Sequence, residues 1–432
     1  MGRKNRFCNN IYVLKVIFKN SSYLLMSQLL VKVFAFAYAI FLAGNIGASD
    51  FGLYSAALSI FGLMSLFSDL GINRVLTRDI ARDESELPKL FSTALLFRAF
   101  SSAVSFLVLT LFFFFTDLHG TRFTLTTIAL LSLIPQSVAL SIDAILIALK
   151  RVSFSALGFF LFNMISFIAG AGLIYLGYGV HGAMIAFLMG QIAYSVILVY
   201  LLYSSRKIKD ESSSRVKPGI NFAPFNFTLA KSLILKSWPY GVVAALGYAS
   251  FRIDTVILSY ARNGEEAGIY ALAYRFLEAA TIIPVAFGTV LYPVFSQHSA
   301  DHTKTKNLFN NSLLYGGLGG FVVLIIMNTL VPWFLTIFMP ESFNGSATTL
   351  VILSFALPFL FMHIPLSQLI LSKDQFLKKI VLLYLLIFAI NLLVMLSVIP
   401  VFGYTGAAWV TVFSEATTFL GFWIFIKKTL KL

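Results

Sequence analysis

Long, uninterrupted apolar runs dominate this sequence and restrict it to one broad class of fold. Several of them reach about 20 residues, the length that an α-helix needs to cross the hydrocarbon core of a bilayer. Hydrophobic residues make up 59% of the 432 residues and charged residues only 12%. A water-soluble fold cannot hide so much apolar surface, so a soluble enzyme is excluded. The runs are continuous rather than alternating, which favours helices over the strands of a membrane barrel.

We predict an all-α membrane protein with about twelve transmembrane helices. The first run has no cleavage site after it, so we interpret it as a retained span rather than a signal peptide. The predicted spans are residues 23–43, 53–67, 90–115, 123–149, 153–176, 183–202, 237–259, 268–291, 312–330, 348–371, 380–399 and 407–426.

The distribution of Lys and Arg predicts the orientation of the chain. With the N-terminus inside, the cytoplasmic segments contain 26 of the 32 basic residues and the outer loops contain 2. This bias follows the positive-inside rule and places both termini in the cytoplasm. The formal net charge of +14 then divides into +17 on the inner face, −3 outside and zero within the spans. We therefore expect the basic inner face to contact anionic lipid headgroups, not nucleic acid.

The chain divides into two related halves of six spans each. A polar linker, residues 203–236, separates an N-lobe (23–202) from a C-lobe (237–426), with an interfacial N-terminal segment (1–22) and a short cytoplasmic tail (427–432) at the ends. Asp50-Phe-Gly-Leu-Tyr54 recurs as Glu266-Ala-Gly-Ile-Tyr270 at an offset of 216, and Gly179-Val-His-Gly-Ala recurs as Gly403-Tyr-Thr-Gly-Ala at an offset of 224. An even number of spans per half predicts parallel repeats related by a pseudo-two-fold axis along the membrane normal.

Four ionisable residues lie at comparable depth in two consecutive spans of the C-lobe. Arg252 is placed to meet Glu278, and Asp254 to meet Arg275, while Arg275 and Glu278 are also neighbours at i,i+3. Charged groups inside a membrane normally face protein or a wet cavity. Two interpretations remain open: a structural network that neutralises itself, or a network that rearranges during transport or carries a coupling ion.

The N-lobe has a less balanced set of charges. Lys32 and Arg98 lie at similar depth, and the acidic candidate in the spans of this lobe is Asp143. Two cations with one counter-ion predict an anion site, and a phosphate group suits it because Arg binds phosphate bidentately and Lys binds it as a point charge. The alternative is that Lys32 extends to the interface or pairs with Glu415 of the last span.

The remaining polar residues predict no cofactor or metal site. The lone cysteine, Cys8, and the five histidines show no metal-ligand spacing, and the sequence contains no phosphate-binding glycine loop followed by Lys-Ser or Lys-Thr. Coupling to a proton or sodium gradient is the remaining source of energy. Among the polar residues within spans, Asn163 and Asn391 are the best candidates for contacts with sugar hydroxyls.

The ordered motifs resemble those of a known family. They are Asp50-Phe-Gly-Leu-Tyr54, Asp69-Leu-Gly71, Arg252-Ile-Asp254, Gly268-Ile-Tyr-Ala-Leu-Ala-Tyr-Arg275 and Gly403-x-x-Gly-Ala407. Together they resemble the Wzx-type O-antigen and repeat-unit flippases of the multidrug/oligosaccharidyl-lipid/polysaccharide exporter superfamily. The resemblance implies a V-shaped pair of six-helix bundles in the bacterial cytoplasmic membrane. It also implies alternating access and a substrate of oligosaccharide linked through pyrophosphate to undecaprenol, with polysaccharide-assembly proteins as partners.

Two other classes of function compete with a flippase. A multidrug exporter of the same superfamily would extrude cationic amphiphiles by ion antiport, with Asp143 or Glu415 as coupling groups, but Lys32 and Arg98 disfavour cationic cargo. A glycosyltransferase or polymerase needs a substantial loop or soluble domain to carry its chemistry, and the sequence has no such outer loop. We therefore predict a transporter and not an enzyme.

Overall fold

The structure, a computed structural model, describes residues 2–116, 120–204, 224–297, 301–371 and 377–430. Side chains are described from Lys32 onward, except at residues 292, 293, 296, 371, 377, 378 and 430. Within these residues the chain is helical and contains no strand, which confirms the predicted all-α class. The α-helices are α1 (Gly2–Asp69), α2 (Ile72–Arg82), α3 (Leu87–Phe115), α4 (Thr121–Leu131), α5 (Leu133–Ala148), α6 (Val152–Leu173), α7 (Gly179–Ser204), α8 (Phe227–Ala261), α9 (Gly264–Ala280), α10 (Ile282–Gln297), α11 (His302–Phe338), α12 (Asn344–Ser354), α13 (Leu357–Leu371) and α14 (Leu377–Leu430).

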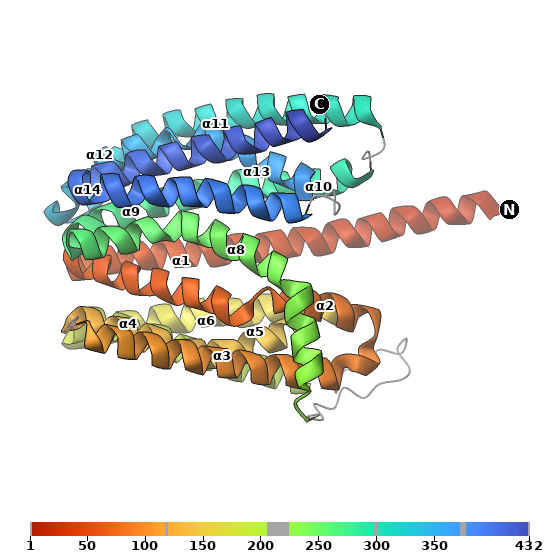
Figure 1. Ribbon diagram of the computed structural model, residues 1–432, viewed down its shortest axis with the longest axis horizontal. Coiled ribbons are helices and arrows are strands. Elements are labelled where there is room, and N and C mark those ends of the chain that lie inside the picture. The colour runs from red at the N-terminus through yellow and green to blue at the C-terminus, as the bar shows by residue number, and fades with distance from the viewer. Residues whose placement is uncertain (1, 117–119, 205–223, 298–300, 372–376, 431–432) are drawn as a thin grey trace.

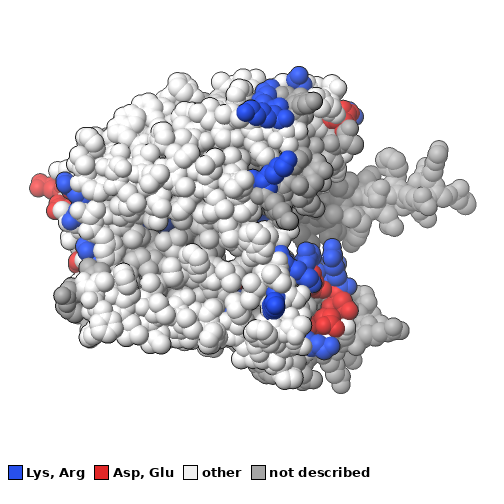
Figure 2. Space-filling model, viewed as in Figure 1, with Lys and Arg blue, Asp and Glu red and all other residues white. Residues whose placement is uncertain are grey.

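The helices form two groups with α1 and α8 between them. In Figure 1, α3 to α6 lie below these two central helices, and α10 to α14 lie above them. One large buried cluster joins both groups and includes Phe51 of α1 and Tyr270 of α9. Figure 2 shows charged side chains at the two ends of the molecule and an almost uncharged surface between them. That uncharged belt is the surface expected of a protein that crosses a membrane many times.

Eight helical segments of the described chain are long and apolar enough to cross a membrane, or nine if the bent pair α12 and α13 is one span. Three of the eight are interrupted by glycines with positive φ, at Gly47, at Gly177 and Gly179, and at Gly403. At Gly47 the chain of α1 turns back on itself, so that α1 has two arms (Figure 1). The two arms of such a helix are counted as one segment, so the prediction of twelve spans stays a prediction. The orientation of the termini also stays a prediction.

Two of the predicted segments differ in extent from the helices that contain them. The predicted interfacial segment, residues 1–22, forms the beginning of α1, and its side chains lie outside the described ones. The described chain resumes at residue 224, and α8 begins at Phe227 with Asn226 as its N-cap, so the last ten residues of the predicted linker are helical. Residues 205–223 lie outside the described residues. The first turns of α8 pack on α2 and α3 of the other group, where Leu233 joins the core around Ile72.

The two groups meet backbone to backbone where the second arm of α1 crosses α9. A Cβ atom at Gly52 would overlap the carbonyl oxygen of Gly264, and a Cβ atom at Gly268 would overlap the carbonyl oxygen of Ala48. Only glycine allows this approach. At the repeat offset of 216, residue 264 is the counterpart of Ala48 and residue 268 is the counterpart of Gly52. Replacing each residue by its counterpart in the other half therefore turns one contact into the other. A two-fold relation between the halves produces this pattern locally, while the relation between whole lobes stays a prediction. We call this crossing the glycine contact.

The two repeated motifs touch each other in the C-lobe. The Glu266 carboxylate accepts a hydrogen bond from the backbone N–H of Tyr404 (3.2 Å) and forms an ion pair with Arg262 (3.0 Å). The glycine before Tyr404 has φ 59° and ψ −141°, and its counterpart Gly179 has φ 51° and ψ −136°. The motifs recur because the same glycine turn is present in each half. Each turn lies next to an acidic residue: Glu266 contacts the turn at Gly403, and Asp50 interacts electrostatically with His181, just after Gly179.

Substitution of Glu266 tests this hairpin contact. We expect Glu266→Ala to lower the free energy of unfolding by roughly 1–3 kcal/mol, because an amide donor and an Arg lose a charged acceptor. Chemical unfolding of the purified protein in detergent measures the change. Glu341→Ala, at an exposed carboxylate in the short 3₁₀ helix Glu341–Phe343, is the matched control and should leave stability unchanged. Equal stability of both variants would show that the Glu266 contact contributes nothing.

Candidate functional site

Two arginines share one glutamate where α8 and α9 lie side by side. Arg252 forms an ion pair with Oε1 of Glu278, and Arg275 donates a hydrogen bond from Nη1 to Oε2 of the same carboxylate (3.1 Å). These three side chains are 18%, 20% and 29% exposed. We call them the arginine cluster. With two cations and one anion it has a net charge of +1, and the buried Nε of Arg275 has no hydrogen-bond partner among the described residues.

The arginine cluster lies between the two helix groups. Tyr248, one turn before Arg252 on α8, packs against Gly62 of α1 so closely that a Cβ atom there would overlap its hydroxyl group. Tyr54, also on the second arm of α1, interacts electrostatically with Arg275. The cluster is therefore held by α8 and α9 from one half and faces a helix of the other half. A group bound here contacts both halves at once.

Asp254 interacts electrostatically with Arg252 but forms no direct ion pair with the arginine cluster. Its carboxylate accepts hydrogen bonds from the hydroxyl group of Tyr270, from the backbone N–H of Thr255 (2.7 Å) and from Thr411 (3.4 Å). The residue is 1% exposed. The expected pairing of Asp254 with Arg275 is therefore wrong, because Tyr270 and Thr411 satisfy the carboxylate instead. The expected pairs of Glu278 with Arg252 and with Arg275 are confirmed.

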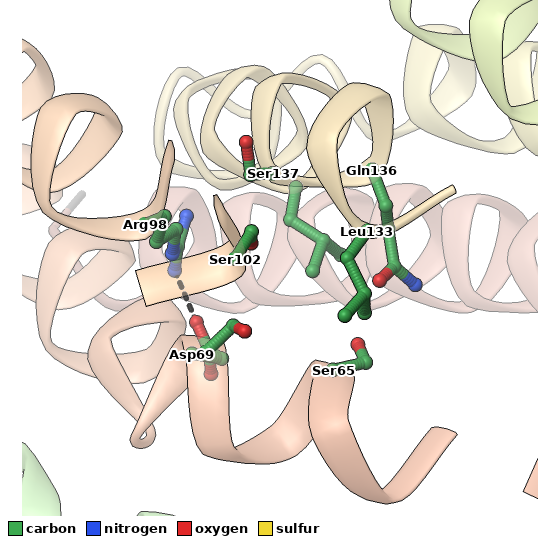
Figure 3. Close-up of a pocket in the computed structure, with 9 residues that line it drawn as sticks. Ser65, Asp69, Arg98, Ser102, Leu133, Gln136 and Ser137 are labelled. Atoms are coloured by element: carbon green, nitrogen blue, oxygen red, sulfur yellow. Dashed lines mark hydrogen bonds and ion pairs between the residues drawn. The ribbon is translucent and has the colours of Figure 1, made fainter. Parts of the chain in front are cut away.

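Arg98 forms a second polar cluster, inside the N-lobe. It is 1% exposed and forms an ion pair with Asp69, the last residue of α1. It also donates hydrogen bonds to Ser141 (3.0 Å) and to Asn73 (3.3 Å). Figure 3 shows Arg98 and Asp69 pointing toward each other beside a small cavity. Ser65, Ser68, Ser102, Leu133, Gln136, Ser137 and Leu140 line the cavity with them.

The structure changes the expected surroundings of the two N-lobe cations. Asp69 is the direct counter-ion of Arg98, whereas Asp143 accepts a hydrogen bond from Ser155 and interacts with Arg98 only at longer range. Lys32 is exposed on the first arm of α1 and forms no ion pair with another described residue. Its alternative partner, Glu415, contacts His363 instead, with 2.7 Å between Oε2 and Nε2. The role of Lys32 and Arg98 as pyrophosphate ligands stays a prediction.

The two asparagines expected to contact sugar are separated in the fold. Asn163 of α6 donates a hydrogen bond to the carbonyl group of Phe159 (2.8 Å). Asn391 of α14 is 1% exposed, and its Oδ1 atom accepts a hydrogen bond from Thr417 (3.0 Å). Their role as sugar contacts also stays a prediction. In the described residues, no group of three or more His, Cys, Asp or Glu side chains is placed to hold a metal ion.

Sequence reasoning missed several residues of these clusters. Asp69 was named only as part of the Asp69-Leu-Gly71 motif and not as a partner of Arg98, although it closes α1 and turns toward α3. Tyr270 was noted as a repeated motif residue and not as the donor to Asp254. His363 lies on a helix that is far from Glu415 in the sequence, and no spacing rule connects them. The motif Asp69-Leu-Gly71 was the one sequence signal that pointed to any of these missed residues, namely Asp69.

The comparisons with known proteins agree with this architecture. The sequence profile of a family described as polysaccharide biosynthesis protein matches residues 17–299, which is more than half of the chain. The chain belongs to this family. No curated protein matches it in sequence.

Solved structures of membrane transporters share the fold. The lipid II flippase MurJ in its inward closed conformation has a TM-score of 0.71 at 16% identity and covers 94% of this chain and 87% of its own. An inward-facing multidrug resistance MATE transporter of the MOP superfamily has a TM-score of 0.73 at 15% identity, with 92% and 96% covered. A MOP superfamily transporter from Pyrococcus furiosus, described as having a binding pocket of reversed polarity, has a TM-score of 0.59 at 16% identity, with 93% and 92% covered. The protein is therefore a multi-pass membrane protein with the fold of this transporter superfamily.

Proposed function

We propose that the protein is a flippase that moves an oligosaccharide repeat unit, linked through pyrophosphate to undecaprenol, from the cytoplasmic to the outer leaflet of the bacterial inner membrane. Its product would serve the assembly of a surface polysaccharide such as O-antigen or capsule. Membership of the polysaccharide biosynthesis family and the shared fold with a lipid II flippase support this proposal.

The observation that carries the proposal is the arginine cluster between the halves. A lipid-linked sugar joined through pyrophosphate carries negative charge at the point where its polar head meets its apolar tail. Arg252 and Arg275 offer a net positive, partly exposed pair of guanidinium groups, and guanidinium groups bind phosphate oxygens bidentately. Phosphate oxygens would compete with Glu278 for the same donors.

The division of the substrate follows from solvation. A sugar head and its pyrophosphate cannot cross hydrocarbon unaided, because burial of unpaired polar groups costs several kcal/mol each, roughly 2–7 kcal/mol on transfer scales. The isoprenoid tail is apolar and is therefore stable in the lipid. We propose that the head passes between the halves, along the arginine cluster, while the tail stays in the bilayer. The basic residues at the ends of the helices would then also hold anionic lipids.

A multidrug exporter working by cation antiport is the second candidate, because a MATE transporter shares the fold. The net positive charge of the arginine cluster disfavours cationic drugs at this position. Measuring the drug susceptibility of cells with and without the protein distinguishes the two functions. An exporter lowers susceptibility, whereas a flippase leaves it unchanged.

Replacing Arg275 tests the proposed function. We expect Arg275→Gln to slow transport roughly 10- to 100-fold, since one charge-assisted contact contributes about 1.5–3 kcal/mol and each 1.4 kcal/mol is a factor of ten. Surface polysaccharide in a cell that depends on this protein, normalised to protein level, is the measurement. Lys32→Ala and Arg98→Ala are tested in parallel for the predicted N-lobe phosphate site.

Arg82→Gln provides the matched control, because Arg82 is an exposed arginine at the end of α2. It should leave surface polysaccharide unchanged. Normal polysaccharide in the Arg275→Gln variant, at normal protein level, would show that the arginine cluster does not hold the substrate.

A further inference from the structure

Helix α8 is much longer than one membrane span. Its 35 residues reach about 52 Å at a rise of 1.5 Å per residue, whereas the hydrocarbon core of a bilayer is about 30 Å thick. Figure 1 shows that α8 bends and that its first turns run across the other long helices instead of parallel to them. Pro239 inside α8 cannot donate a hydrogen bond to the carbonyl group of Leu235, which accounts for a bend. We call residues 227–238, before this proline, the surface arm.

One face of the surface arm packs on the N-lobe. Ala230, Leu233 and Ser237 are buried on this face, and Leu233 joins a core cluster with residues of α2. Just after the arm, a Cβ atom at Gly241 would lie 2.5 Å from the carbonyl carbon of Leu70. The arm is therefore fixed against the end of the N-lobe.

A second face of the surface arm is exposed and mostly apolar. Phe227, Leu235 and Trp238 are 75%, 62% and 42% exposed, and Lys231 lies between them along the helix. These four positions are four, four and three residues apart, so they form one stripe along the helix. Large apolar side chains are unfavourable in water, and a lysine is unfavourable deep in hydrocarbon. The stripe therefore fits the boundary between the two, where aromatic rings and lysines are enriched.

The surface arm is positively charged. Lys231 and Lys236 are both exposed, and α8 has no acidic residue before Asp254. Neither lysine forms an ion pair with another described residue. A basic helix beside a bilayer is complementary in charge to anionic headgroups, and each lysine near such a surface contributes about a fivefold preference for it.

We propose that the surface arm lies in the headgroup region of the leaflet at the predicted cytoplasmic end. Phe227, Leu235 and Trp238 point toward the acyl chains, and Lys231 binds the phosphate groups of anionic lipids. The proposal assigns to one helix and one lysine the lipid contact that the sequence predicted for the whole basic face. It is independent of the arginine cluster and does not rest on the proposed function.

The fluorescence of Trp238 in the full-length protein tests the depth of the arm. Trp333, Trp409 and Trp423 are exposed, and replacing them with phenylalanine leaves Trp238 as the one reporter. The protein is reconstituted in phosphatidylcholine that is brominated either near the headgroup or near the chain ends. We expect stronger quenching by bromine near the headgroup, and little quenching by aqueous iodide. A variant that retains Trp409 instead, an exposed residue of α14, is the control for quenching by lipid.

Two results would overturn the position of the arm. Quenching of Trp238 by iodide and not by brominated lipid would show that the stripe faces water, as the surface for a protein partner does. Stronger quenching by bromine near the chain ends would show that the arm lies inside the hydrocarbon.

A comparison of brominated phosphatidylglycerol with brominated phosphatidylcholine tests the anionic headgroup. We expect Trp238 to report a preference for phosphatidylglycerol that Lys231→Gln lowers about fivefold and Lys231→Arg retains. Lys306→Gln, at an exposed lysine of α11, is the matched control and should leave the preference unchanged. If the wild type shows no preference, or if Lys231→Gln keeps it in full, Lys231 does not bind an anionic headgroup and the proposal is refuted.

Discussion

Replacing Gly268 with alanine should abolish transport, although alanine is the better helix former by about 1 kcal/mol. The new Cβ atom would overlap the backbone carbonyl oxygen of Ala48 across the glycine contact. A backbone cannot move aside as a side chain does, so the second arm of α1 and α9 must separate. If the proposed transport works by alternating access, the two halves must close at this crossing and open again.

A labelling experiment shows whether the contact has opened. Ala267 is fully buried beside the crossing, and a cysteine there, in a Cys8→Ser background, reports its accessibility. We expect faster labelling by a membrane-impermeant thiol reagent in the Gly268→Ala variant than in its parent. Gly44→Ala is the matched control, because no atom lies within 4 Å of a Cβ added there. Normal transport by Gly268→Ala would mean that the halves need not close at this crossing.

Arg98→Ala should lower the free energy of unfolding by about 3–5 kcal/mol, the usual cost of removing one partner from a buried ion pair. The substitution leaves the Asp69 carboxylate without its cation and removes the donors that Ser141 and Asn73 accept from. Unfolding of the purified protein in mixed detergent measures the change, and the amount of protein in the membrane should fall with it.

The double variant Arg98→Met and Asp69→Leu distinguishes a structural role of the Arg98 ion pair from a role of Arg98 in binding phosphate. Replacing both partners with apolar residues of similar size is often neutral for stability, so the double variant should recover most of the loss. If it then also transports normally, Arg98 supports the fold and does not hold phosphate. A double variant as unstable as Arg98→Ala would show that the loss arises from packing and not from the unpaired carboxylate.

The helix class and the two glycine turns of like conformation were accessible from the sequence because they depend on local patterns. Continuous apolar runs specify membrane helices without any knowledge of neighbours. The recurrence of Asp50 and Gly179 as Glu266 and Gly403 located two hairpins of like conformation. The glycines with positive φ at Gly47, at Gly177 and Gly179, and at Gly403 all lie in gaps between predicted spans.

The candidate site was predicted in part, and the errors have one physical cause. Pairs between adjacent helices of known loop length, such as Arg252 with Glu278, follow from depth along the helix axis. Depth alone does not give rotation about that axis. It therefore could not show that Asp254 turns toward Tyr270, or that Asp69 turns toward Arg98. The structure accordingly shows a partly exposed pair of arginines in the C-lobe, whereas the anion site at Lys32 and Arg98 of the N-lobe stays a prediction.

The exchange of partners at the glycine contact also bears on how such a chain evolves. Ala48 with Gly268 and Gly52 with Gly264 are the two contacts that a pair of identical subunits would make from one surface. Once both copies lie in one chain, each position mutates independently, but a larger residue at any of the three glycines is blocked by the backbone of the other copy. The crossing thus has the local geometry that an interface between two identical subunits would have, while the surrounding helices differ, with a buried ion pair in one half and an arginine cluster in the other.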